Sequence, residues 1–242
     1  MKSLLPILIL LLSMAPVLAQ EEQKETRPMH KNEVKFQLTD VINGRYTVGY
    51  ERAVGRHIGV ALSVGNKTKD GLLKISGLDS EFFKTNDLTY SGFRIVPEVK
   101  YYLNEHTQGM LSGFYFGAYI TYVNLKSEFK GIYMNEDGDF PFHYDVNIRT
   151  NSLGFMVGYK LPVSKRFYID FMIAGPGAGN YRFEFKEIVA APDEFWIDLN
   201  DELELISIFD LINADFEFSS SNTSDSLILP SFRYGITLGY SF

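Results

Sequence analysis

The 242-residue sequence contains no cysteine, which excludes a disulfide framework and a lipid anchor attached through cysteine. Basic residues are in the minority, because 23 lysines and arginines stand against 30 aspartates and glutamates, a net charge of −7. This balance lacks the basic surface that nucleic-acid binding needs, so no nucleic-acid partner is predicted. After the N-terminal region, no run of roughly 18 apolar residues occurs that could form a membrane-spanning helix.

Motifs for nucleotides, cofactors and metals are also missing. The sequence has no glycine-rich phosphate-binding motif, no CxxC and no HExxH. The segment Asn135–Asp139 resembles a calcium loop only faintly, since the alternating ligands and the distal glutamate of such a loop are absent. We therefore expect an Asp- and Gly-rich turn there, and neither a cofactor nor a metal site is predicted.

The N-terminal region has the features of a secretory signal peptide for export by the Sec route. Lys2 gives a short positive start, Leu4–Leu12 is almost unbroken apolar sequence, and Val17–Ala19 precedes Gln20. Cleavage is expected after Ala19, so that 1–19 is the signal peptide. The alternative is a membrane anchor, which the short apolar core disfavours. Residues 20–32 are polar and aperiodic and predict a flexible lead, which leaves 33–242 as one domain.

The chain is rich in aromatic residues, with 15 tyrosines and 20 phenylalanines, and these recur at every second position. An alternation of period two predicts β-strands. Asn43-Gly44 is a strong hairpin signal between the first two of them. The eight predicted strands are Lys35–Ile42, Tyr46–Val54, His57–Gly65, Phe93–Leu103, Gly113–Val123, Ser152–Leu161, Phe167–Ile173 and Phe232–Phe242.

The two faces of these strands differ in a way that predicts their orientation. One face is bulky and apolar, and we expect it to contact lipid; its members include Phe114, Phe116, Ile120, Phe155, Phe171, Ile236 and Leu238. The other face is rich in glycine and carries charges of both signs, as a narrow interior with paired ions requires. Its predicted charge network consists of Lys35, Glu51, Arg94, Glu98, Lys100, Lys160, Asp170 and Arg233. A soluble lipocalin-like barrel with the apolar face inward is the structural alternative.

The predicted connectors alternate between short and long. Those at 55–56, 104–110 and 162–165 are short, whereas those at 66–91, 127–146 and 187–229 are long and are expected outside. This asymmetry predicts an all-β fold, an eight-stranded antiparallel up-and-down transmembrane β-barrel of the outer membrane with long outer loops. Asp40 and Arg52 fall on the apolar face, and we expect both near strand ends at the membrane interface.

Several segments resemble a family of small outer-membrane barrels of unknown function from the Bacteroidota. The resemblance lies in Tyr50-Glu51-Arg52 and in the strand around Pro97–Tyr102, and it covers most of 33–185 together with the C-terminal segment. It implies a fold and an envelope location in a Gram-negative cell, but no activity. Tyr240 and Phe242 resemble a C-terminal insertion signal, which implies the barrel-assembly machinery as a partner during insertion. Outer-membrane lipid and lipopolysaccharide are the other expected partners.

Two regions remain as candidates for chemistry. His143 and Asp145, with a nearby serine, are compatible with a lipid A-modifying enzyme, but their spacing has no specificity. The stretch Glu187–Leu229 holds eleven acids and no Lys or Arg, and apolar residues recur at helical spacing within Pro192–Phe216. That pattern predicts a loop helix that packs its apolar side on the barrel rim, with cation bridging or partner docking as functional alternatives.

The sequence favours a non-catalytic envelope protein with a structural or surface-interaction role. A narrow channel or transporter for small hydrophobic molecules is the first alternative, and a lipid A-modifying enzyme is the second. A wide pore is not expected at this strand number.

Overall fold

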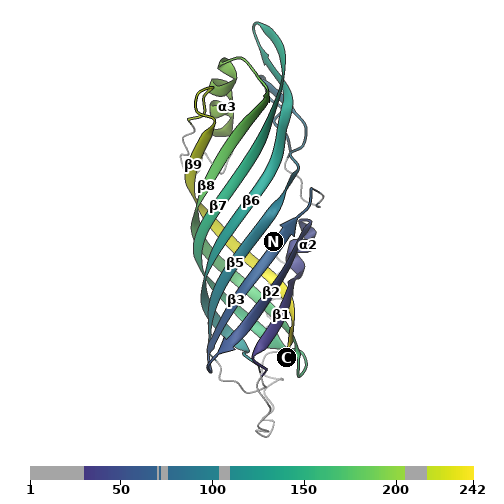
Figure 1. The fold of residues 1–242 in the computed structure, drawn as a ribbon, viewed down its shortest axis with the longest axis vertical. Helices are drawn as coiled ribbons and strands as arrows, with labels where there is room; N and C mark the ends of the chain where they lie inside the picture. Colours follow the sequence, from purple (N-terminus) through teal and green to yellow (C-terminus); the bar gives the residue numbers. More distant parts are fainter. Residues whose placement is uncertain (1–29, 70, 72–75, 104–109, 205–216) are drawn as a thin grey trace, which may run out of the picture.

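The computed structural model describes residues 30–69, 71, 76–103, 110–204 and 217–242 (Figure 1). The predicted signal peptide and most of the predicted lead lie outside these residues. The described elements, in chain order, are β1 (Asn32–Gln37), α2 (Leu38–Ile42), β2 (Arg45–Val54), β3 (Ile58–Lys67), β4 (Phe83–Thr85), β5 (Tyr90–Tyr102), β6 (Gly113–Asn135), β7 (Gly138–Pro162), β8 (Phe167–Val189), α3 (Glu194–Glu204) and β9 (Ser224–Ser241).

Eight of these strands close into one antiparallel ring. The order is β1-β2-β3-β5-β6-β7-β8-β9, and β1 pairs with both β2 and β9. The short strand β4 lies outside the ring, on the edge of β6. The ring is uneven, because β6 and β7 pair along their whole length whereas β1 pairs with β9 only from Glu33–Ser241 to Gln37–Thr237. The predicted eight-stranded antiparallel ring is thus confirmed, without an even barrel shape.

The predicted strand Lys35–Ile42 is confirmed as far as Gln37 and wrong from Leu38 onward, and the predicted tight hairpin at Asn43-Gly44 is wrong. The strand ends at Gln37, and Leu38–Ile42 forms the short helix α2, whose C-terminal turn includes Gly44 at φ +65°. Helical backbone turns the carboxylate of Asp40 inward, where it is buried against Arg94. A straight strand would have directed this charge outward, so the expectation that Asp40 lies at the membrane interface is also wrong.

The predicted outer loop Ser127–Asp145 is instead a long β-hairpin. Alternation continues without a break along β6 and β7, and the turn is Asn135–Gly138, where Asn135 Oδ1 accepts the N–H of Asp137 at 2.9 Å. The many polar residues of this stretch suggested a loop, but its charged residues occupy outward positions and the turn. The inward positions remain large and aromatic, as at Phe129 and Tyr144.

The third predicted loop, 187–229, is also shorter than expected. β8 runs through Gly175-Pro176-Gly177 to Val189, with a register shift between Met172 and Gly175, and β9 begins at Ser224. As a result β6, β7, β8 and β9 extend beyond the short strands β1–β3 as an upright sheet (Figure 1). The predicted helix corresponds to α3 up to Glu204, and its continuation to Phe216 lies outside the described residues.

The outer surface of the lower ring is apolar. The predicted lipid-facing side chains lie on this surface, from Phe155 with 72% exposure to the half-buried Phe171. From Phe114 to Tyr122 on β6 and from Leu153 to Leu161 on β7, every outward position is apolar or aromatic. Neither helix among the described residues is long and apolar enough to cross a membrane.

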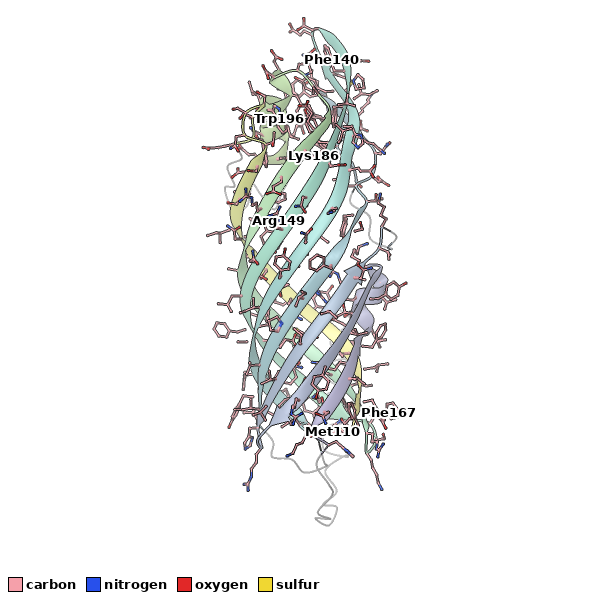
Figure 2. All side chains as sticks on the ribbon, in the orientation of Figure 1. Met110, Phe140, Arg149, Phe167, Lys186 and Trp196 are labelled. Carbon is pink, nitrogen blue, oxygen red and sulfur yellow. The ribbon has the colours of Figure 1, made fainter. Side chains whose placement is uncertain are left out.

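The inside of the ring consists of two layers with different chemistry. The lower layer is ionic and is built by inward side chains of β1, β2, β5, β7, β8 and β9. The upper layer is an aromatic cluster in which side chains of α3 and β4 pack against the sheet. It includes Trp196 of α3, Phe83 of β4 and Tyr133 of β6. Figure 2 shows Phe167 near one end of the molecule and Phe140 and Trp196 near the other, with Arg149 and Lys186 between them.

Candidate functional site

Glu51, on β2, is the centre of the ionic layer. Its carboxylate accepts hydrogen bonds from Lys35 Nζ at 2.9 Å, Lys160 Nζ at 3.0 Å and the Tyr102 hydroxyl at 2.7 Å. Lys100 Nζ lies 3.5 Å from the same carboxylate. All five side chains are buried, so each charge depends on these partners in place of water.

Two further carboxylates extend the network across the interior. Arg233 Nη2 donates to Glu98 Oε1 at 2.9 Å. Lys100 Nζ donates to Asp170 Oδ2 at 2.6 Å, while Asp170 Oδ1 accepts the hydroxyl of Tyr115 at 2.7 Å. These pairs join β5 to β8 and β9, which lie on different sides of the ring.

A fourth carboxylate makes the network neutral. Glu33 Oε2, on β1, accepts a hydrogen bond of 2.6 Å from Lys160 Nζ. Glu33 was not predicted, although its spacing of two from Lys35 places both side chains on one face of a strand. The network then holds four acids and four bases, Glu33, Glu51, Glu98, Asp170, Lys35, Lys100, Lys160 and Arg233.

Tyrosine rings complete this layer. Lys160 Nζ lies 4.9 Å from the ring centre of Tyr102 and 4.6 Å from that of Tyr168, within the range of cation–π attraction. A hollow beside Lys35, Lys100 and Arg233 measures about 20 Å³, room for about one water molecule. The layer therefore closes the interior at this level.

Arg94 is the one predicted network residue that the structure assigns to a separate group. Its guanidinium donates to Asp40 of α2 and lies 3.3 Å from the hydroxyl of Thr47. Thr47 in turn donates to Asp40 at 2.5 Å, and Arg45 Nη1 lies 3.8 Å from the same carboxylate. No sequence signal identified this group, because it depends on the helix that replaces the end of the predicted strand.

The aromatic layer positions α3. Phe195, Trp196 and Leu199 are buried against inward side chains of β6, β7 and β8. Tyr133 donates a hydrogen bond of 2.5 Å to Asp198, which ties β6 to the helix. Burial and this bond to a carboxylate raise the pKa of the Tyr133 phenol. The prediction of a loop helix packed by its apolar side on the rim agrees with this arrangement.

His143 and Asp145 lie on the outward face of β7. His143 Nε2 is 4.0 Å from Asp145 Oδ1, and the structure gives that nitrogen no hydrogen-bond partner. Among the residues that the structure describes, no three His, Cys, Asp or Glu side chains are grouped so as to hold a metal ion.

Comparison of the chain with models of protein families, with curated proteins and with solved structures found no match. The resemblance to small outer-membrane barrels from the Bacteroidota therefore stays a prediction, as does the barrel-assembly machinery as a partner.

Proposed function

We propose that the chain is a non-catalytic outer-membrane protein, closed at its centre, that carries a rigid outer extension with a structural or surface-interaction role in the envelope. The observation that carries this proposal is the change along the outward face of β6, β7 and β8. Apolar positions end at Asn124, Asn151 and Asn180, and Asn151 pairs directly with Asn180. The next outward residue on each strand is charged, Lys126 on β6, Arg149 on β7 and Arg182 on β8.

The dimensions of the apolar band support a membrane location. The stretches Phe114–Tyr122 and Leu153–Leu161 each have nine residues, close to the roughly 9–11 residues of a tilted transmembrane strand. Aromatic pairs lie near both borders, as they do in outer-membrane barrels. The ring centres of Phe93 and Tyr122 are 5.7 Å apart near one border, and those of Phe167 and Tyr240 are 5.1 Å apart near the other.

The part beyond the band supports a role at the cell surface. The upper halves of β6–β9 are stiffened by a packed aromatic interior and covered by α3. A flexible loop would pay an ordering cost on binding, whereas a preformed surface does not. The described end of the extension is acidic, with Glu194, Asp201 and Glu202 on α3.

Membrane fractionation tests the proposal. The full chain, expressed with its N-terminal region in a Gram-negative host, is expected in the outer-membrane fraction. It is also expected to migrate faster on a denaturing gel before heating than after heating. Recovery in the soluble periplasmic fraction, with no heat-dependent mobility, would contradict the membrane location and favour a soluble barrel.

One observation favours a second candidate, the passage of small hydrophobic molecules through the wall. Above Gln37 and Thr237, β9 has no strand on its β1 side, and α2 takes that place with Leu38, Val41 and Ile42 exposed. An apolar groove of about 890 Å³ lies below it, along the outside of β1. A helix in the wall lacks the ladder hydrogen bonds that hold strands together, so this seam is the weakest part of the ring.

A disulfide across the seam tests this candidate. The hydroxyl of Thr39 is 2.9 Å from the position of a Cβ on Gly235, so Thr39→Cys with Gly235→Cys can cross-link in a chain with no other cysteine. Uptake of the hydrophobic fluorophore N-phenyl-1-naphthylamine by cells carrying the oxidised double variant is expected to fall, and reduction should restore it. Equal uptake in both redox states would remove the seam as a path.

A further inference from the structure

We propose that the outward face of β6, β7 and β8, directly beyond the apolar band, binds the phosphate groups of a phosphorylated lipid of the outer leaflet. The inference rests on the proposed membrane location. It adds a ligand class and a site to that proposal.

Basic side chains are concentrated on this face. Lys126 on β6, Arg149 on β7 and Arg182 and Lys186 on β8 are all exposed and all point to the side that the apolar band occupies lower down. The register places Arg149 beside Arg182, and Asp145 beside Lys186. Figure 2 shows Arg149 and Lys186 above the lower half of the ring.

The height of this face matches the headgroup region of a membrane. Lys126 is the next outward residue after Asn124, and Arg149 and Arg182 are the next outward residues beyond Asn151 and Asn180. Lipid phosphates lie in the interfacial layer that directly borders the hydrocarbon core. A lipid whose chains contact the band therefore presents its phosphates to these cations.

Most acids on this face are already paired with cations. Glu184 accepts from Arg149 at 2.7 Å and lies 3.1 Å from Arg182 Nε. Glu128 is 3.1 Å from Lys69 and 3.0 Å from Lys130, and hydrogen bonds from both lysines lower the pKa of Glu128 to about 2. Glu128 therefore stays ionised at neutral pH, and these two acids neutralise only part of the positive charge of this face.

Two lysines are left with no acidic partner among the described residues, Lys126 and Lys186. They lie two strands apart, about 10 Å across β7. Between them is a hollow of about 550 Å³, whose lining also includes Lys69, Asn147 and Ser91. Three carboxylates line it as well, the paired Glu128 and Glu184 and, on β7, Asp145. A phosphorylated headgroup seated in this hollow would receive an ammonium group from each side, and the amide of Asn147 and the hydroxyl of Ser91 in the lining are further donors.

The matched variants are Lys126→Gln with Lys186→Gln, and Lys165→Gln in the exposed turn at the opposite end of the ring. Purified protein in detergent is titrated with diphosphoryl lipid A, with the same lipid after removal of its phosphates, and with inorganic phosphate, and binding is followed by native mass spectrometry. The wild-type protein and the Lys165 variant are expected to bind diphosphoryl lipid A most tightly. Each removed lysine should weaken that binding about fivefold, or roughly 25-fold for both.

Three outcomes would overturn the inference. Equal affinity for the dephosphorylated lipid would mean that the acyl chains alone are bound. Equal affinity of the double lysine variant and the wild-type protein for diphosphoryl lipid A would mean that the phosphates bind elsewhere on the protein. Displacement of the lipid by millimolar inorganic phosphate would make free phosphate the ligand. Fractionation and heat-dependent mobility of the same variants report separately on membrane location, so this inference can fail while the proposed function stands.

Discussion

Tyr168 on β8 faces Gly239 on β9 across two paired strands, and its ring covers the glycine so closely that a Cβ has no room. The same relation recurs between Tyr115 and Gly158. Glycine on the inward face therefore has a specific role, which is to seat a tyrosine ring from the neighbouring strand. These rings in turn complete the ionic layer, since Tyr168 lies beside Lys160 and Tyr115 donates to Asp170.

Gly239→Ala is expected to destabilise the ring by about 1–3 kcal/mol, because the added methyl group must displace a packed ring. The measurement is the urea midpoint of heat-dependent gel mobility. Tyr168→Leu in the same chain should recover part of the loss, since the smaller side chain makes room for the methyl group. Equal stability of Gly239→Ala and the wild-type protein would show that the tyrosine ring is not held over the glycine.

Glu51→Gln is expected to cost about 3–5 kcal/mol of unfolding free energy, because three buried lysines lose the carboxylate they share. Glu128→Gln is the matched control. Glu128 also has two lysine partners, but on the surface, where ion pairs contribute little. The same unfolding assay should show a large loss for the first variant and almost none for the second. Similar losses for both would mean that the interior is hydrated.

A closed interior also predicts a lack of conductance. In planar bilayers the wild-type protein is expected to show no stable open level, whereas Glu98→Ala with Arg233→Ala should allow ions to pass. Removing both members of the pair leaves no uncompensated charge and enlarges the hollow beside it. The control is Arg149→Ala with Glu184→Ala, which removes an arginine–glutamate pair from the outward face. This variant should show no conductance. A wild-type conductance equal to that of the Glu98 and Arg233 variant would contradict the ionic seal.

The part of the fold that could be predicted from sequence is the part governed by alternation. Where β2, β3, β5 and β6 cross the apolar band, inward and outward positions differ in chemistry, and the period of two is visible without structural information. The same alternation placed Glu51, Glu98 and Lys100 on the inside, because once the apolar face of a strand is assigned to the outside, its other face must point inward. Partners across the ring, such as Lys160 with Glu33, could not be predicted, since they depend on register and on ring closure.

Two errors have separate physical causes. The hairpin at 127–146 was mistaken for a loop because many of its outward residues are charged whereas its inward residues are mostly aromatic. The contrast between the two faces is therefore the reverse of that in the apolar band. The helix α2 was missed because five residues are too few for a helical period to be visible. Asp40 of this helix is buried beside Arg94 of β5, a tertiary contact that the sequence pattern does not show.

The aromatic layer and the helix α3 that packs on it are together called the aromatic cap, and its stability can be tested by changing the pH. The chain has a single tryptophan, Trp196, which lies inside this cap with 4% exposure and reports on its packing. Burial and the bond to Asp198 raise the pKa of Tyr133, so the folded cap favours the neutral phenol. The stabilisation from a raised phenol pKa is complete below the ordinary tyrosine pKa of about 10 and is lost as the pH rises above it. The emission of Trp196 should therefore stay blue-shifted up to about pH 10 and move to longer wavelength beyond it.

Tyr133→Phe provides the control for this transition. The variant cannot ionise at that position, so the red shift of Trp196 should move to higher pH, although the bond to Asp198 is lost. Tyr144 can still ionise in this variant; its ring centre is 5.2 Å from that of Trp196, and burial raises its pKa as well. Heat-dependent gel mobility of the ring should not change over this range, because the cap and the ionic layer are separate packing units. Two results would show that Tyr133 does not hold α3 over the sheet. One is a Trp196 red shift that occurs at the same pH in Tyr133→Phe as in the wild-type protein, and the other is a red-shifted Trp196 emission of the wild-type protein at neutral pH.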